Sequence, residues 1–176
     1  MYAEAEGADA IGIVVCSDSP RSVSLDLAAE ILDSLGPFTP GICVSHTRLQ
    51  SDLDAILALG PSAIQCFHPF AKPQRRGVKM IRAVRPGETI PGECDAIIID
   101  GSHGRGEPFD QAFARGIMRE SPVPVILAGG LTPENVKEAI EKVHPYAVDV
   151  ATGVEAKPGI KDRRKVRAFL RACRSG

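Results

Sequence analysis

The chain has 176 residues, enough for one domain with a sizeable hydrophobic core, and 44% of them are hydrophobic while 24% are charged. Its formal net charge of −1 gives no electrostatic reason to expect binding to nucleic acid or to an anionic membrane surface. No apolar run approaches the ~20 residues of a membrane-spanning helix, and the first residues, MYAEAEGADA, lack the pattern of a secretory signal.

Cysteine and histidine are spread along the chain rather than grouped. The five cysteines form no CxxC pair and the four histidines have no HxxxH spacing, so the sequence predicts no metal site. An odd, unpaired set of cysteines is typical of a reducing compartment. We therefore expect a cytoplasmic protein without a disulfide framework.

Seven short apolar runs, rich in Val and Ile, predict strands that are buried on both faces, as in a parallel sheet. They cover residues 10–15, 41–44, 63–67, 78–84, 96–100, 123–128 and 147–151. Between most of them lie segments with apolar residues at helical spacing, residues 24–35, 51–59, 133–143 and 161–173. Ser24, Ser51 and Thr132 are candidate N-caps, and the Pro-rich segments 68–77 and 85–93 predict loops.

This alternation of strands and helices predicts an α/β fold, and glycines after the last two strands favour a (β/α)8 TIM barrel of the phosphate-binding type. No linker divides the chain, so residues 1–176 are expected to form a single barrel domain. A full barrel has eight strands, and seven are found here. Residues 3–6 have the composition of a helix end closed by Gly7, which predicts that a strand is missing upstream and that the domain is truncated at its N-terminus.

Two glycine turns follow consecutive strands near the end of the chain. Gly129 and Gly130 follow the strand VPVILA, and Thr152 and Gly153 follow the strand AVDVA. Glycine lets a backbone approach an anion closely, and the loops after the last two strands of such barrels often bind phosphate. We therefore expect these four residues to hold a phosphate group.

The same residues resemble a known family. ILAGGLTPENV followed by PYAVDVATGVEAKPGIKD resembles the carboxyl-terminal signature of phosphoribosylanthranilate isomerase, an enzyme of tryptophan biosynthesis. GADAIGIVVCSDSPRSVS resembles the second strand and following loop of that family, and DGSHGRGEPFD its segment after the sixth strand. The resemblance runs from about Gly7 to the end of the chain and is weakest between residues 37 and 93.

The resemblance implies an Amadori rearrangement of N-(5-phosphoribosyl)anthranilate to 1-(o-carboxyphenylamino)-1-deoxyribulose 5-phosphate, a small-molecule isomerisation that uses no cofactor. In the family, an Asp at the end of the sixth strand is the general acid, and the matching residue is Asp100. Arg21 matches an arginine of the family that positions the substrate, and its fork of donors suits the anthranilate carboxylate. Asp149 is expected to be structural.

The family's general base is a Cys that ends its first strand, and no such residue precedes Asp9 in this sequence. Three readings stay open: the natural chain begins earlier, Cys16 is a substitute base, or the protein is a catalytically defective paralogue that binds a sugar phosphate or a partner chain. Another sugar-phosphate barrel, such as indoleglycerol-phosphate synthase, would use a strand lysine, for which Lys79 is the candidate. A missing strand would also leave open sheet edges, which predicts a homo-oligomer.

Overall fold

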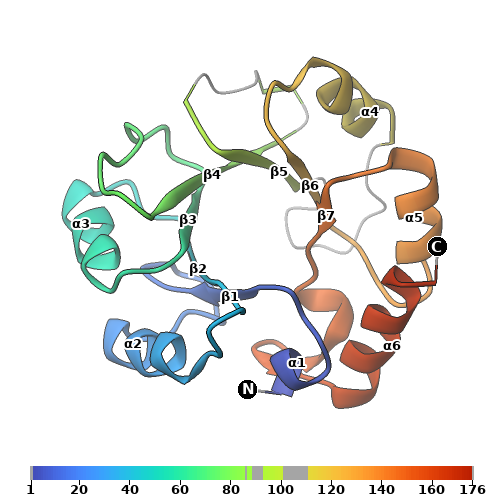
Figure 1. Cartoon of the computed structure of the whole chain (residues 1–176), viewed down its shortest axis with the longest axis horizontal. Coiled ribbons are helices and arrows are strands. Elements are labelled where there is room, and N and C mark those ends of the chain that lie inside the picture. Colours follow the sequence, from blue (N-terminus) through green and yellow to red (C-terminus); the bar gives the residue numbers. More distant parts are fainter. Residues whose placement is uncertain (1, 86, 89–92, 101–110, 176) are drawn as a thin grey trace. The chain divides into compact units, whose positions relative to one another are not determined.

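The computed structural model describes residues 2–85, 87–88, 93–100 and 111–175 (Figure 1). They form two compact units. The first unit comprises residues 1–82 and 93–95, and the second comprises residues 83–92 and 96–176. Each unit is built from parallel strands with helices on one face, and the two are described in turn.

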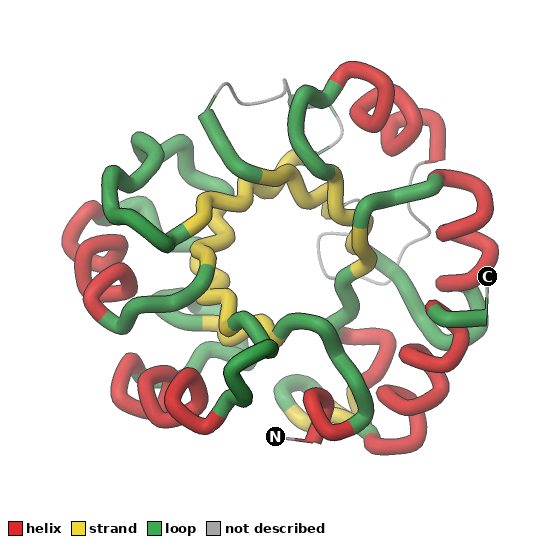
Figure 2. The backbone as a smooth tube through the Cα atoms, viewed as in Figure 1, coloured by secondary structure: helices red, strands yellow, loops and turns green. Residues whose placement is uncertain are grey.

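In the first unit, a short helix precedes four strands that pair in chain order. The elements are α1 (Tyr2–Ala5), β1 (Ile11–Val14), α2 (Leu25–Ser34), β2 (Gly41–Ser45), α3 (Gln50–Ala58), β3 (Ala63–Cys66) and β4 (Lys79–Val84), the last of which continues into the second unit. The strands are parallel, with Ile11 paired to Gly41, Ile42 to Ala63, and Ala63 to Lys79. Helices α2 and α3 cover one face of these strands (Figure 2).

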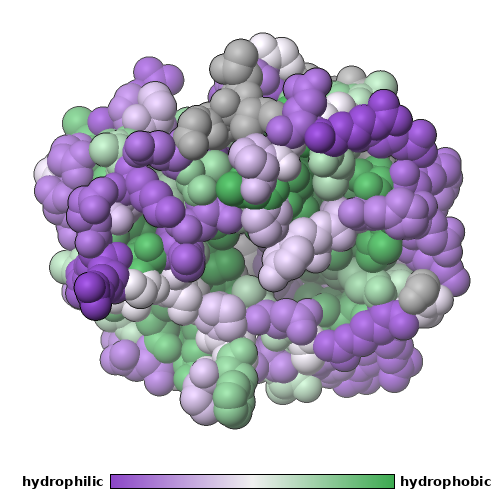
Figure 3. Space-filling view, turned by 45° about the horizontal axis from the view of Figure 1, so that its top comes forward, coloured by the Kyte–Doolittle hydropathy of each residue, from purple (hydrophilic) through white to green (hydrophobic). Residues whose placement is uncertain are grey.

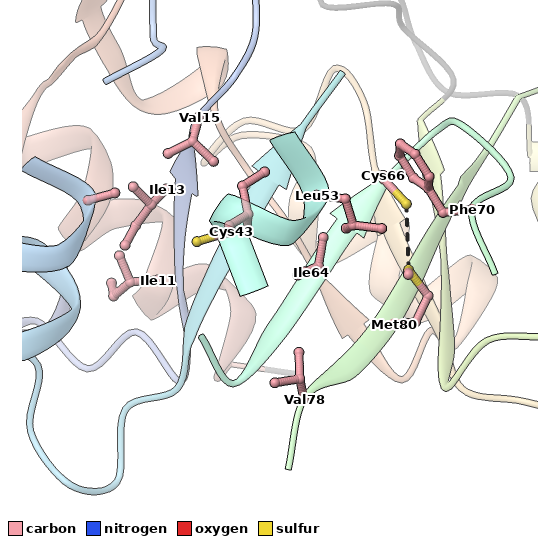
Figure 4. Close-up of a cluster of buried hydrophobic side chains, with 12 residues drawn as sticks. Ile11, Ile13, Val15, Cys43, Leu53, Ile64, Cys66, Phe70, Val78 and Met80 are labelled. Atoms are coloured by element: carbon pink, nitrogen blue, oxygen red, sulfur yellow. Dashed lines mark hydrogen bonds between the residues drawn. The ribbon is translucent and has the colours of Figure 1, made fainter. Parts of the chain in front are cut away.

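The core of the first unit lies between its strands and its helices (Figure 4). It is made of side chains that alternate along the strands together with apolar residues of the helices: Ile11, Ile13, Val15, Ala28, Cys43, Leu53, Ile56, Ile64, Cys66, Phe70, Val78 and Met80. Removing such side chains from water is the main free-energy gain of folding. The apolar spacing that predicted strands and helices is therefore what packs them together.

In the described part of the second unit, three parallel strands pair in chain order and three helices accompany them. The elements are β5 (Ala96–Asp100), α4 (Gln111–Glu120), β6 (Val125–Ala128), α5 (Val136–Val143), β7 (Ala147–Val148), the 3₁₀ turn η1 (Thr152–Val154), the hairpin strands β8 (Glu155–Lys157) and β9 (Ile160–Lys161), and α6 (Arg163–Cys173). Ile97 pairs with Val125, and Ile126 pairs with Ala147. Asp162 caps α6 by accepting from two backbone N–H groups of its first turn.

All seven predicted strands are confirmed, as are the four predicted helices, within a few residues at their ends. Helix α1 and the positive φ of Gly7 match the predicted helix end, and residues 68–77 form the predicted loop, whereas residues 85–93 lie partly outside the described residues. Helix α4 and the β8–β9 hairpin were not predicted. The prediction that residues 1–176 form one truncated domain stays a prediction.

The capping predictions have mixed outcomes. Ser24 caps α2, because its hydroxyl accepts from the Leu27 N–H. Ser51 is wrong as a cap, since it lies inside α3 and Leu49 precedes that helix without a side-chain hydrogen bond. Thr132 is also wrong as the cap of α5, because the chain makes a separate turn before that helix begins at Val136.

The face of the molecule seen in Figure 3 is largely hydrophilic, and hydrophobic residues show between the polar side chains in small groups. Among the described residues, no helix is long and apolar enough to cross a membrane.

Asp95 is the centre of an ion-pair cluster in the first unit. Its Oδ1 atom lies 2.8 Å from Lys72 Nζ and 3.2 Å from Lys79 Nζ, and its Oδ2 atom accepts from the Met80 N–H at 2.9 Å. Desolvation raises the pKa of Asp95, but the hydrogen bonds from Lys72, Met80 and Lys79 outweigh it and lower the pKa to about 2. The cluster ties the start of β4 to the segment that leads into β5.

We predict that Asp95→Asn lowers the free energy of unfolding by about 1 to 2 kcal/mol at neutral pH, since the variant loses a carboxylate stabilised in the folded state. A carboxyl group whose pKa is lowered by folding stabilises the fold at every pH above its ordinary pKa. That stabilisation is lost as the pH falls toward the lowered pKa of about 2. The difference between wild type and variant should therefore shrink between pH 4 and pH 2 in urea titrations. Asp33→Asn, at an exposed site on α2, is the control. A difference that stays constant over this range would contradict the role of Asp95.

Candidate active site

The carboxyl ends of β5, β6 and β7 bring two carboxylates to one edge of the second unit. Asp100, the last residue of β5, pairs with Ala128, the last residue of β6. The Asp149 N–H, directly after β7, donates to the Leu127 carbonyl at 2.9 Å. Ligands of parallel α/β sheets bind at this end of the strands, and the strand register places both carboxyl groups there.

The Gly-Gly turn after β6 has a backbone that only glycine adopts readily. Gly129 has φ 87° and Gly130 has φ 66°, so any side chain there would strain the turn. Asn135 holds the turn from the other side: its Nδ2 donates to the Gly130 carbonyl at 2.9 Å, and its Oδ1 accepts from the Thr132 N–H at 2.7 Å. Asn135 was not predicted from the sequence, although its position three residues after Thr132 in TPEN is the spacing of such a side-chain bridge.

The second glycine turn packs directly on the first. A Cβ atom built on Gly153 would lie 1.9 Å from the Leu131 carbonyl oxygen, far inside van der Waals contact. Leu131 is itself buried, so the backbone that Gly153 touches is anchored in the core of the unit. Only glycine at position 153 lets the loops after β6 and β7 meet.

These loops and the two carboxylates line one pocket of about 90 Å³. The lining residues come from the end of β5, the loop after β6 and the loop after β7: Asp100, Ala128, Gly129, Gly130, Leu131, Asp149, Val150, Ala151, Thr152 and Gly153. Asp100 and the four residues predicted to hold phosphate therefore lie together. The pocket combines a carboxyl group with closely approached backbone, the two elements that sugar-phosphate chemistry requires.

Asp149 lines this pocket beside Asp100. Its side chain is exposed at the surface of the concavity, yet protein surrounds it closely enough for desolvation to raise its pKa. Attraction to Lys161 opposes this effect, and repulsion by the Asp100 carboxylate adds to it. The two carboxyl groups therefore interact electrostatically.

Lys161 and Glu155 form an ion pair that contacts the loop after β7. Lys161 Nζ donates to the Ala151 carbonyl at 2.9 Å and lies 3.2 Å from Glu155 Oε1, and the Glu155 side chain is only 3% exposed. The same Glu155 oxygen accepts from the Gly159 N–H. A buried carboxylate with a cation and an N–H donor fixes the β8–β9 hairpin, and the Lys161–Ala151 hydrogen bond links that hairpin to the loop after β7. Neither residue could be predicted from the sequence, because their partners become adjacent only through that hairpin.

Cys16 and Arg21, the other predicted site residues, lie in the loop after β1 in the first unit. Cys16 has a positive φ of 47°, and its carbonyl accepts from Ser45 Oγ at 3.1 Å. Desolvation, followed by repulsion from Asp52, raises the pKa of the Cys16 thiol, which makes its thiolate scarcer. Arg21 is half-buried, and its N–H donates to Ser19 Oγ. The roles of Cys16 as substitute base and Arg21 as substrate-positioning residue stay predictions.

The segment 101–110, which carries the motif matched after the sixth family strand, lies outside the described residues. Within residues 2–85, 87–88, 93–100 and 111–175, no cluster of three or more His, Cys, Asp or Glu side chains could hold a metal ion.

Glycine loops and a strand-end carboxylate around one small pocket are typical of sugar-phosphate enzymes with parallel α/β folds. Comparison with known proteins narrows this class. Residues 74–172 match the family model of N-(5'-phosphoribosyl)anthranilate isomerase. The N-(5'-phosphoribosyl)anthranilate isomerase of Methanoregula boonei is 53% identical over 175 residues, which cover 99% of this chain and 90% of the relative.

Solved structures of isomerases with this name have a similar fold. N-(5'-phosphoribosyl)anthranilate isomerase from Pyrococcus furiosus superimposes with a TM-score of 0.80 at 32% identity, covering 99% of this chain and 94% of that one. An isomerase solved with reduced 1-(o-carboxyphenylamino)-1-deoxyribulose 5-phosphate gives a TM-score of 0.76 at 26% identity, covering 99% and 92%. The chain belongs to the phosphoribosylanthranilate isomerase family. Membership of this family confirms the predicted α/β barrel fold class. It also confirms the prediction of an isomerase of tryptophan biosynthesis.

We predict that Gly153→Ala weakens binding of inorganic phosphate by about tenfold, because the displaced loop loses about one charge-assisted hydrogen bond. The added methyl group should also lower the free energy of unfolding by about 1 to 3 kcal/mol through overpacking. Titration calorimetry and urea unfolding measure the two effects.

The matched control is Gly116→Ala in helix α4, where a Cβ atom would meet nothing within 4 Å. This change should leave phosphate binding intact and stabilise the helix by about 0.5 to 1 kcal/mol. Equal phosphate affinity in Gly153→Ala and wild type would contradict the contact as a determinant of the site.

Proposed function

We propose that this chain converts N-(5-phosphoribosyl)anthranilate into 1-(o-carboxyphenylamino)-1-deoxyribulose 5-phosphate, with Asp100 as the general acid. The observation that carries the proposal is the single pocket in which Asp100 meets both glycine loops. Family membership supports the choice of substrate. The pocket supports the roles proposed for Asp100 and for the glycine loops.

Two proton transfers convert the substrate into the enol form of the product, which then becomes the ketone. An acid protonates the furanose ring oxygen, the C1–O bond breaks, and the nitrogen lone pair forms an iminium at C1. A base then removes the proton from C2, which gives the enol form of the amine, and this tautomerises to the ketone. Asp100 at the strand end is suited to the first transfer, because general acids work from within hydrogen-bond reach of the leaving oxygen. All atoms of the substrate remain in the product, so the proposal includes no cofactor.

The phosphate group would be held by Gly129, Gly130, Thr152 and Gly153. Two observations support this assignment: the positive φ angles of the first pair and the close packing of Gly153 on the Leu131 carbonyl. Both expose main chain rather than side chains to the pocket. Backbone held in this way can approach an anion closely at no cost in side-chain entropy.

Cys16 is the candidate base within this chain. Desolvation raises the pKa of its thiol, and this observation favours a second candidate function, binding without catalysis. A thiol held in its neutral form is a poor base. The second candidate is therefore a protein that binds a sugar phosphate, or a partner chain, through the same pocket without turnover. The two functions share the phosphate site and differ in proton transfer.

We predict turnover of freshly prepared N-(5-phosphoribosyl)anthranilate, followed as loss of substrate fluorescence, and a fall in kcat of at least about 10²-fold in Asp100→Asn. Cys16→Ser tests the base in the same assay, and Asp33→Asn controls for the loss of one carboxylate. Retained activity in Asp100→Asn would contradict the assignment of the acid. A wild-type chain that binds phosphate without turnover would establish the second function instead.

We also propose a cytoplasmic location, because an odd set of five cysteines without a CxxC pair is typical of a reducing compartment, and self-association through a sheet edge. In the described part of the first unit, β1 pairs with β2 and otherwise makes only a single bridge beyond its end, from Val15 to Val23. An edge strand of this kind can pair with another chain.

We predict that sedimentation at micromolar concentration shows a species larger than the 18.7 kDa chain. Gly12→Pro would remove one N–H donor from β1 and should shift the equilibrium toward the monomer. A wild-type chain that sediments as a monomer would contradict association through this edge.

A further inference from the structure

Asn135 bonds to two consecutive peptide groups of the turn after β6, although it is not one of the residues that line the pocket. Its Nδ2 atom donates to the Gly130 carbonyl at 2.9 Å, and its Oδ1 atom accepts from the Thr132 N–H at 2.7 Å. The carbonyl of the intervening Leu131 points at Gly153, where an added Cβ atom would lie 1.9 Å from its oxygen. Both peptide groups that flank Leu131 are therefore held in one orientation.

This orientation decides which polar atom of the turn faces the pocket. In a planar trans peptide group the C=O and N–H bonds point in opposite directions. Because the Gly130 carbonyl is held on Asn135, the Leu131 N–H is turned toward the opposite side of the turn. Leu131 lines the pocket although its side chain is only 2% exposed, so its main chain is the part that can meet a ligand.

Three successive N–H groups of the turn are available to a ligand. Within the described residues, the N–H groups of Gly129, Gly130 and Leu131 donate to no protein acceptor. Successive N–H groups beside residues with left-handed φ form a concavity that binds anions. The described lining of the pocket includes two carboxylates and no basic side chain, so binding of an anion there depends on main-chain donors.

We propose that Asn135 is a positioning residue for the phosphate group of the substrate. It keeps the Gly130 carbonyl out of the pocket, where that oxygen would repel an anion, and presents the Leu131 N–H in its place. The turn needs this support, because glycine lets a peptide group rotate at little cost. The Thr132 N–H, already bound to Asn135, is not a donor to the phosphate. This inference rests on the proposed function, since it takes this pocket as the phosphate site.

Titration with inorganic phosphate, followed through the amide NMR signals of the chain, tests this role. In wild type we expect phosphate to shift the amide proton signals of Gly129, Gly130 and Leu131 downfield and to shift that of Thr132 much less. In Asn135→Ala the shift of the Leu131 signal should be lost. The dissociation constant for phosphate should rise about tenfold, which corresponds to roughly one charge-assisted hydrogen bond.

Ser121→Ala is the matched control, because Ser121 makes the same kind of bridge in the loop before β6. Its Oγ atom donates to the Val123 carbonyl at 2.7 Å and accepts from the Val123 N–H at 3.2 Å. This variant should lower the urea midpoint as Asn135→Ala does, yet keep its phosphate affinity within about twofold of wild type.

Asn135→Asp is a second variant that keeps the fold if Asn135→Ala does not. Its carboxylate still accepts from the Thr132 N–H but has no donor for the Gly130 carbonyl, which it repels. The Gly130–Leu131 peptide group should then turn, and phosphate affinity should fall by at least about tenfold.

A Leu131 amide signal that phosphate does not shift in wild type, while those of Gly129 and Gly130 respond, would overturn the role of Asn135 and leave the phosphate site in place. Wild-type affinity in both Asn135 variants, or a loss in Ser121→Ala as large as that in Asn135→Ala, would overturn it too. If phosphate shifts no amide signal of the pocket in wild type, the phosphate site of the proposed function is contradicted as well.

Discussion

The contact between Gly153 and the Leu131 carbonyl is the constraint on which the shape of the pocket beside Asp100 depends. It brings the loop after β7 against the loop after β6 at a distance that no side chain at position 153 allows. On one side Asn135 fixes the Gly130 carbonyl, and on the other Lys161 fixes the Ala151 carbonyl. The pocket is therefore shaped by main chain, and its geometry follows from the packing of two turns on buried residues.

The same packing sets the electrostatics of the site. Pairing of β5 with β6, and the bond from Asp149 to β6, bring two carboxyl groups into one concavity. Desolvation and the neighbouring Asp100 raise the pKa of Asp149, which lowers the free energy of unfolding at neutral pH. Attraction to Lys161 offsets part of this loss. Interacting carboxyl groups of this kind are common at sites that transfer protons. The ion pairs of Asp95 in the first unit show the opposite case, where the partners stabilise the charged form.

The strands and the glycine turns could be predicted from the sequence, because each depends on residues that are neighbours along the chain. Val/Ile-rich runs predicted the seven strands, and glycines after two of them predicted the two turns that line the pocket. The role of Asp100 as general acid rests on the family resemblance and stays a prediction. Helix α4 was missed, although Phe113, Ala114 and Ile117 have helical spacing, because Gly116 interrupts a short polar segment. Asn135, Lys161 and Glu155 could not be assigned, since their partners are carbonyls that only the folded turns bring near. The contacts of His46 with Ser17 and Phe67 join residues from three strand ends, and no local pattern connects them.

A crystal structure of the chain with reduced 1-(o-carboxyphenylamino)-1-deoxyribulose 5-phosphate would test the central claim most directly. The predicted result is a phosphate group within hydrogen-bond distance of the backbone N–H groups of Gly129, Gly130 and Gly153, with the Asp100 carboxyl in reach of the sugar. A phosphate bound outside this pocket, or an Asp100 side chain turned away from the sugar, would contradict it.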